Sequence, residues 1–251
     1  MKRIYGKKHI GMTNKNSFGT IMKIVDYIDC NNIYVEFQDE YKYVKHASMK
    51  NFSRGSIANP YDKTVLGVGF IGHGVYSKEN DTDCYTCWRN MLIRCFSKEY
   101  KEKYPTYKES FVDNEWLNFQ NFAKWYYENI YYVPNERTEL DKDILYKNNK
   151  IYSKDTCIFV PRRINSLLIN NKSVRGKYPV GVDLYDGRFR ARCNTPNGSV
   201  FIGNYDTAEL AFEAYKKYKQ HYIKQIADEY RDKIPNKLYN ALYSYTIEKG
   251  D

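Results

Sequence analysis

Three arginines alternate with apolar residues in the segment Arg188-Phe189-Arg190-Ala191-Arg192-Cys193. Successive side chains of a β-strand point to opposite faces, so a strand here places all three arginines on one face and the apolar side chains on the other. Only Asp183 and Asp186 lie close by in the sequence as counterions. Arginines that share an open sheet face suit a polyanion, and the pattern therefore predicts a nucleic-acid contact. A solvated sheet face with acidic partners is the alternative interpretation.

A more specific pattern continues on both sides of these arginines. The matching segments are Gly181-Val182, Gly187 to Ala191, Ile202 to Glu209 and Ala211 to Tyr215. Over about 55 residues the chain resembles the Apetala/ethylene-response-factor DNA-binding domain. The resemblance implies a three-stranded sheet that enters the major groove and one helix that backs it. It makes Arg188, Arg190 and Arg192 the expected groove residues.

Charge is concentrated in the same part of the chain. The 251 residues carry 40 Lys and Arg against 30 Asp and Glu, a net charge of +10. The stretch from Lys142 to Arg192 alone holds twelve basic and four acidic residues. Such a cluster is typical of phosphate binding, and double-stranded DNA is the expected partner. The further residues that we expect to contact DNA are Tyr185, Arg175, Lys177, Arg162 and Arg163.

A second pattern precedes this domain. The segments Leu140 to Ile144, Asn148 to Tyr152 and Asp155 to Asn165 resemble the ββα-metal core of HNH nucleases. In that core the first strand carries an Asp metal ligand followed by a His general base, and an Asn or His on the helix completes the metal site. The resemblance places Asp141 at the first ligand position and Asn165 at the last. It implies a divalent cation, with Mg²⁺ the expected ion, that polarises a phosphate.

The general-base position holds Lys142 where the family has His. A lysine is mostly protonated near pH 7 and is then a poor base. Asp143 is an alternative base, on the opposite strand face from Lys142, and Lys142 is alternatively a clamp on phosphate. A third interpretation is that the fold persists without cleavage. The candidate catalytic set is Asp141, Lys142, Asp143 and Asn165.

The pair Cys84-x-x-Cys87 has the spacing of half a zinc site. Only Cys95 is near, and the three cysteines fall at helical spacing among apolar residues. We therefore interpret them as core residues and expect no zinc; the same holds for Cys157 and Cys193.

The elements that must position these residues follow from hydrophobic periodicity and turn residues. The expected strands are residues 21–28, 33–37, 41–44, 139–144, 157–160, 178–184, 188–193 and 200–205. The expected helices are residues 84–96, 115–129, one that begins at Pro161, one from Asp206 or Thr207 to about residue 230 with Leu210 in its apolar stripe, and a short one after Pro235. This order predicts an α+β fold that ends in a three-stranded antiparallel sheet packed on one long helix.

Four ranges follow from these elements. Residues 1–76 form a small β-rich module, for which an extension of the DNA contact and the binding of a protein partner are equally open. Residues 80–173 form a helical region with the HNH-like core at about 138–170. Residues 176–232 form the DNA-binding domain, and residues 233–251 a helical tail.

Composition excludes other classes of protein. No apolar run approaches the roughly 18 residues of a membrane helix, and the N-terminus lacks the apolar core of a signal peptide. Six cysteines in 251 residues do not make a disulfide scaffold. We expect no membrane partner and a cytoplasmic protein, in the bacterial host cytoplasm if it is phage-encoded.

Three functions remain open on the sequence. The first is a phage or mobile-element homing-type endonuclease that cuts or nicks double-stranded DNA. The second is a catalytically inactive DNA-binding regulator on the same scaffold. The third is a phage protein that inhibits a host factor.

Overall fold

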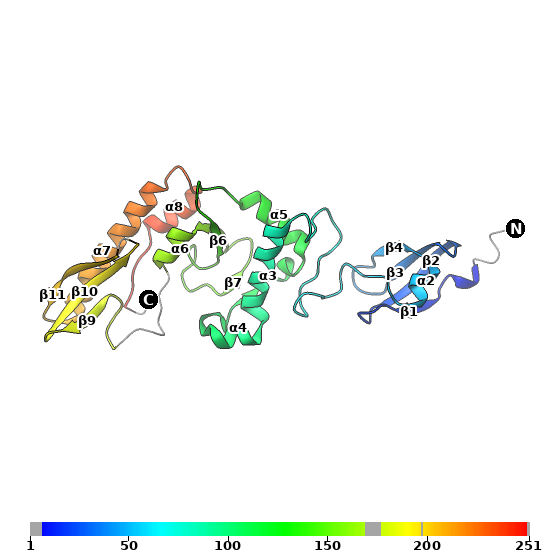
Figure 1. Ribbon diagram of the computed structural model, residues 1–251, viewed down its shortest axis with the longest axis horizontal. Helices are drawn as coiled ribbons and strands as arrows, with labels where there is room; N and C mark the ends of the chain where they lie inside the picture. The colour runs from blue at the N-terminus through cyan, green and yellow to red at the C-terminus, as the bar shows by residue number, and fades with distance from the viewer. Residues whose placement is uncertain (1–6, 169–176, 197, 250–251) are drawn as a thin grey trace. The chain divides into compact units, whose positions relative to one another are not determined.

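The computed structural model describes residues 7–168, 177–196 and 198–249 of an α+β protein (Figure 1). The chain forms two compact units, Met1–Tyr126 and Tyr127–Asp251. Unit 1 contains the strands β1 Thr13–Lys15, β2 Ile21–Asp29, β3 Asn32–Phe37, β4 Val44–Ala47 and β5 Phe111–Val112. Its helices are η1 Lys7–His9, α2 Met49–Ser53, α3 Thr82–Phe96, α4 Lys98–Lys103, η2 Pro105–Tyr107, η3 Asn114–Leu117 and most of α5 Phe119–Asn129, whose last three residues are counted with unit 2. The described residues contain no helix that is both long and apolar enough to cross a membrane.

The first sheet of unit 1 is antiparallel, in the order β1-β2-β3-β4. Every second residue of β3 is buried, and Ile33, Val35 and Phe37 form the core with residues of β2 and α2. Strand β4 begins at Val44, whereas the sequence predicted a strand from residue 41 to 44. The reason is local: the Asp39 carboxylate accepts hydrogen bonds from the backbone N–H groups of Tyr41 and Lys42, which turns the chain there.

The helices of unit 1 pack around aromatic side chains. The Trp88 indole in α3 is fully buried and donates a 2.7 Å hydrogen bond to the Trp116 carbonyl. The helix predicted from residue 115 to 129 is divided, because Asn118 between η3 and α5 is extended. Cys84 and Cys95 are buried on α3, which confirms their place in the core, and Cys87 is half-buried.

Unit 2 contains the strands β6 Thr138–Asp141, β7 Ile151–Tyr152, β8 Ile158–Pro161, β9 Val182–Tyr185, β10 Arg188–Thr195 and β11 Gly198–Tyr205. Its helices are α6 Arg162–Leu168, α7 Ala208–Glu229 and α8 Asn236–Tyr243. Strands β6 and β8 pair antiparallel and α6 follows β8 directly. Pro161 is the last residue of β8, paired with Thr138, so the prediction that it begins the helix is wrong. A proline suits a strand end because it has no N–H to donate.

The C-terminal sheet has the order β11-β10-β9 and packs on α7 (Figure 1). Asp186 and Gly187 join β9 to β10 with φ of 50° and 70°, the two positive values of a tight hairpin turn. Thr207 caps α7 by accepting from the Leu210 backbone N–H at 3.2 Å. Leu210 itself is 54% exposed, so its predicted place in the apolar stripe is wrong.

One core joins the segments of unit 2. Val160 of β8 and Ile164 of α6 are fully buried in the same cluster as Ala191 of β10 and Phe212 of α7. Cys157 and Cys193 are also buried, as predicted. The β6–β8–α6 segment and the C-terminal sheet therefore belong to one compact unit, whereas the ranges expected from sequence separate them at residues 173–176.

Candidate nucleic-acid interface

The outward face of the C-terminal sheet is built by strand alternation. Ala191 and Cys193 are fully buried toward α7, and Phe189 packs partly against the same core. Arg188, Arg190 and Arg192 occupy the alternate positions of β10, so the prediction that they share one face is confirmed.

Each of the three arginines has an acidic partner. Arg188 pairs with Asp206 at 2.9 Å. The Asp183 carboxylate accepts from Arg190 Nε at 2.9 Å and from Arg190 Nη2 at 3.3 Å, and it also accepts from Arg192. These hydrogen bonds, that from Arg190 first, lower the pKa of Asp183. The expectation that Asp183 and Asp186 are the available acids is wrong for Asp186, because the second acid that binds these arginines is Asp206.

Aromatic and amide side chains complete this face. Tyr185 and Phe201 are each 58% exposed. The Arg190 guanidinium lies 4.3 Å from the centre of the Tyr185 ring. Phe201 pairs across the sheet with Arg192, and Asn204 pairs with Arg190. We name these residues, with the three arginines and Asp183, the outer sheet face.

Sequence reasoning did not identify Phe201 and Asn204. A bulge between Ala191 and Arg192 shifts the register, and this shift brings Phe201 opposite an arginine. The alternation within β11 was the available signal, since Val200 and Ile202 flank Phe201 and a strand that turns them toward the core turns Phe201 outward.

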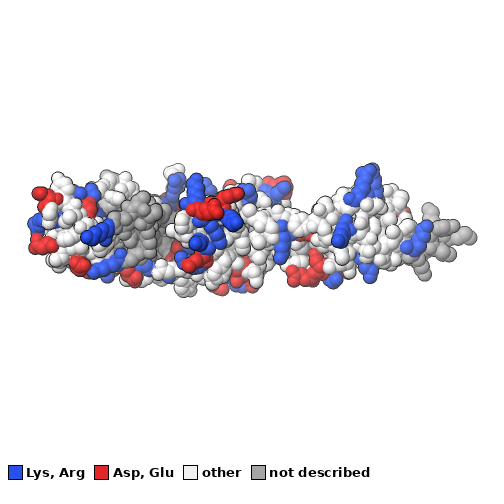
Figure 2. Space-filling view, turned by 90° about the horizontal axis from the view of Figure 1, so that it is seen from below, with Lys and Arg blue, Asp and Glu red and all other residues white. Residues whose placement is uncertain are grey.

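The other residues expected to contact DNA have different environments. Lys177 and Arg162 are exposed. Arg163 forms a 2.7 Å ion pair with Glu229, and its backbone N–H donates to Glu136. Arg175 lies outside the described residues. Figure 2 shows acidic and basic side chains intermingled over the part of the chain that Figure 1 labels β9 to β11.

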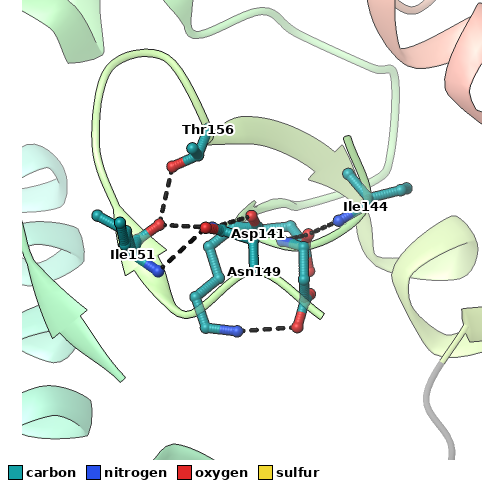
Figure 3. Close-up of polar contacts among 7 residues, drawn as sticks. Asp141, Ile144, Asn149, Ile151 and Thr156 are labelled. Carbon is teal, nitrogen blue, oxygen red and sulfur yellow. Dashed lines mark hydrogen bonds and ion pairs between the residues drawn. The ribbon is translucent and has the colours of Figure 1, made fainter. Parts of the chain in front are cut away.

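Asp141 ends strand β6 through its own side chain (Figure 3). Its Oδ1 atom accepts from the backbone N–H groups of Asp143 at 2.8 Å and of Ile144 at 2.7 Å. The strand therefore stops at Asp141, and its predicted extension to Ile144 is wrong. Burial, followed by repulsion from Asp143, raises the pKa of Asp141 to about 6.

Lys142 is buried beside this turn. Its Nζ atom donates to Asp143 Oδ2 at 2.8 Å and lies 5.8 Å from the centre of the Tyr152 ring. The two residues thus form an ion pair, and the prediction that they lie on opposite strand faces is wrong because β6 has already ended. Asn149 holds the adjoining loop by donating to the carbonyls of Lys142 and Ile151, each at 2.7 Å (Figure 3).

Asn165 on α6 contacts a residue that sequence reasoning missed. Its amide donates to Glu139 Oε2 at 2.8 Å. Glu139 and Asp141 flank the buried Leu140 on β6, so both carboxylates face away from that side chain. Within the described residues, no group of three or more His, Cys, Asp and Glu side chains is placed to hold a metal ion.

Comparison of the chain with protein-family models, with curated proteins and with solved structures found no match.

Proposed function

We propose that the chain binds double-stranded DNA through the outer sheet face. The observation that carries this proposal is a three-stranded sheet that buries one face on α7 and exposes arginine, tyrosine, phenylalanine and asparagine side chains on the other. The major groove of B-form DNA is wide enough to admit a two-stranded β-ribbon, such as β10 with one of its neighbours. Arginine suits the two acceptors of guanine, asparagine suits the acceptor and the donor of adenine, and an apolar ring contacts the methyl group of thymine.

The test of DNA binding is a salt titration. The full chain is mixed with a labelled random-sequence duplex of roughly three helical turns, and fluorescence anisotropy is followed between about 50 and 200 mM KCl. Contacts between arginines and phosphates release counterions, so we expect log K to fall with log [KCl] at a slope of about −3. An absence of binding, or an affinity that does not change with KCl, would favour the protein-interaction alternative.

A second candidate function is metal-dependent DNA cleavage at the β6–β8–α6 segment. The observation that favours it is the antiparallel pair β6·β8 followed by α6, with Glu139 and Asp141 on the strand and Asn165 on the helix. Mg²⁺ in nucleotide-processing sites is held by one or two carboxylates, water and substrate phosphate, so few protein ligands are needed. The donor set fits this, because Asp141 Oδ2 and Asn165 Oδ1 are oxygens of the type Mg²⁺ prefers. A cation held by these oxygens would supply positive charge to the phosphate and the departing oxygen.

Lys142 and Asp143 have a supporting part in this proposal. The buried Lys142 ammonium neutralises Asp143 at 2.8 Å and therefore reduces the repulsion between Asp143 and Asp141. The candidate general base is then Asp143 and not Lys142. A silent regulator with the same outer sheet face is the outcome if cleavage is absent.

The Asp141→Asn variant is expected to change cleavage and stability in opposite directions. The raised pKa means that the folded chain bears an unfavourable charge above about pH 6. Asparagine removes that charge and still accepts the two backbone hydrogen bonds. We therefore expect the variant to gain on the order of 1–3 kcal/mol of unfolding free energy at pH 8. The gain should shrink as the pH falls from about 6 and be mostly lost near pH 4, where Asp141 is protonated in the folded state and partly protonated in the unfolded state.

The same variant should lose any nicking of supercoiled plasmid in Mg²⁺ or Mn²⁺. The plasmid should carry a duplex that the chain has been shown to bind. Urea unfolding at pH 4 and 8, followed by far-UV circular dichroism, gives the stability readout. Equal nicking by wild type and variant would remove Asp141 from the site, and no nicking by either would favour the silent regulator.

A further inference from the structure

Asp183 is the one acid on the outer sheet face that two arginines share. It holds Arg190 through two hydrogen bonds, from Nε and Nη2, and it also accepts from Arg192. The Tyr185 ring lies under the same Arg190 guanidinium, 4.3 Å from its carbon atom. Arg190 is therefore restrained at its edge by a carboxylate and on its flat face by a ring.

The restraint leaves donors for a ligand. A guanidinium has five N–H groups, and Asp183 engages two of those on Arg190. The other three N–H groups of Arg190 have no partner among the described residues. They keep a defined direction, because the two hydrogen bonds to Asp183 and the Tyr185 ring resist rotation of the side chain. A pair of parallel N–H groups matches the O6 and N7 acceptors of guanine in the major groove.

The charges on this face argue against a purely electrostatic clamp. Three arginines and two paired aspartates, Asp183 and Asp206, leave a net charge of +1. A carboxylate also repels backbone phosphate. A surface selected only for tight, sequence-independent binding would gain affinity by losing Asp183. The arrangement instead favours directional contacts with base edges.

We infer that Asp183 is a specificity-determining positioning residue that orients Arg190 and Arg192 to read guanine bases in a DNA duplex. This inference rests on the proposed DNA-binding function. It deepens that function by naming the acid that makes the contacts of these two arginines selective.

The experiment compares two variants that each remove one negative charge from the same sheet. Asp183→Asn loses the carboxylate that holds the arginines. Asp186→Asn is the matched control, because Asp186 lies in the hairpin turn at φ 50°, a conformation that asparagine adopts readily. Duplexes are first enriched from a random library with the wild-type chain. Affinities for the enriched and the random duplex are then measured for each protein across KCl concentrations.

Both variants should bind the random duplex equally well or slightly more tightly than wild type, since each gains one unit of positive charge. Only Asp183→Asn should lose discrimination between the two duplexes, by roughly ten-fold or more. A third variant, Arg190→Lys, keeps the positive charge but lacks the planar guanidinium with its paired N–H donors. It should lose discrimination between the enriched and the random duplex, with an unchanged slope of log K against log [KCl]. Loss of discrimination in both Asp183→Asn and Arg190→Lys supports the inference.

Two results overturn the inference alone. One is enrichment of duplexes without G·C pairs by the wild-type chain, and the other is equal discrimination by wild type, Asp183→Asn and Asp186→Asn. Failure of the wild-type chain to bind any duplex overturns the proposed function as well, so the two failures are distinguishable. Far-UV circular dichroism and the urea midpoint of each variant confirm that it is folded.

Discussion

The Arg190→Ala variant is expected to bind double-stranded DNA roughly ten- to a hundred-fold more weakly than the wild-type chain. Arg190 is the central arginine of the outer sheet face, between Asp183 of β9 and Asn204 of β11. Alanine removes the guanidinium and leaves the Asp183 carboxylate with Arg192 alone. The face then loses a directional donor and one positive charge together.

The magnitude follows from two contributions with different salt dependence. A bidentate arginine contact to a base contributes about 1–3 kcal/mol, and a contact to phosphate reduces the salt slope by about one when it is removed. Anisotropy titrations at several KCl concentrations separate them. A large loss on the enriched duplex with a small loss on random duplex indicates base reading, whereas an equal loss on both indicates phosphate binding.

Arg231→Ala is the matched control for this variant. Arg231 lies in the same compact unit, outside the sheet, and pairs with Asp228 at 3.0 Å. Its removal changes the net charge by the same amount and also breaks one exposed Arg–Asp pair. We expect less than about a three-fold change in DNA affinity, because distant exposed charges are screened by salt. If Arg231→Ala weakens binding as much as Arg190→Ala, the DNA contact is not on the outer sheet face.

The Gly181→Ala variant is expected to destabilise unit 2 by about 2–4 kcal/mol. Gly181 precedes β9 and has a φ of +77°, which L side chains rarely adopt. A Cβ atom at this position would lie 2.1 Å from Cδ2 of Tyr215, a buried residue of α7. The carbonyl of Gly181 also accepts from the Arg192 backbone N–H at 2.8 Å. A shift that relieves the clash would therefore disturb the strand that carries the arginines.

Gly187→Ala isolates the backbone contribution. Gly187 has a similar φ of +70°, but a Cβ atom there meets nothing within 4 Å. We expect it to cost about 1–2 kcal/mol, so the difference between the two variants measures the clash with Tyr215. Equal destabilisation of both variants would show that Tyr215 moves aside freely.

The distribution of tryptophan allows this measurement on the full chain. Trp88, Trp116 and Trp125 are the three tryptophans of the protein, and all lie in unit 1. Tryptophan fluorescence therefore follows the unfolding of that unit, whereas far-UV circular dichroism follows both. The Gly181→Ala variant should lower the urea midpoint of the dichroism transition assigned to unit 2 and leave the fluorescence midpoint unchanged.

Local signals in the sequence were sufficient for much of the fold. Alternation placed Arg188, Arg190 and Arg192 on one face, and Thr207 was one of the two residues predicted to begin the helix α7. Each of these features depends on neighbours within a few residues, which is why a single sequence reveals them. The α+β class and the three-stranded sheet on one helix followed from the same signals, and the structure confirms both.

Element ends were less predictable where a side chain competes for backbone hydrogen bonds. The Asp39 and Asp141 carboxylates each bind two backbone N–H groups and turn the chain, so β4 begins later and β6 ends earlier than periodicity indicates. Hydrophobic patterning does not report such turns, because it follows apolar side chains and not the donors that a carboxylate captures.

The sequence by itself determined which residues could share the outer sheet face, because side-chain direction in a strand depends only on position parity. The tertiary structure decided what those residues contact. Register and a bulge bring Asp183 beside two arginines and Phe201 opposite Arg192, and the packing of α6 on β6 brings Asn165 to Glu139. These pairings join residues between 7 and 26 positions apart in the sequence, and only the folded chain places these side chains next to one another.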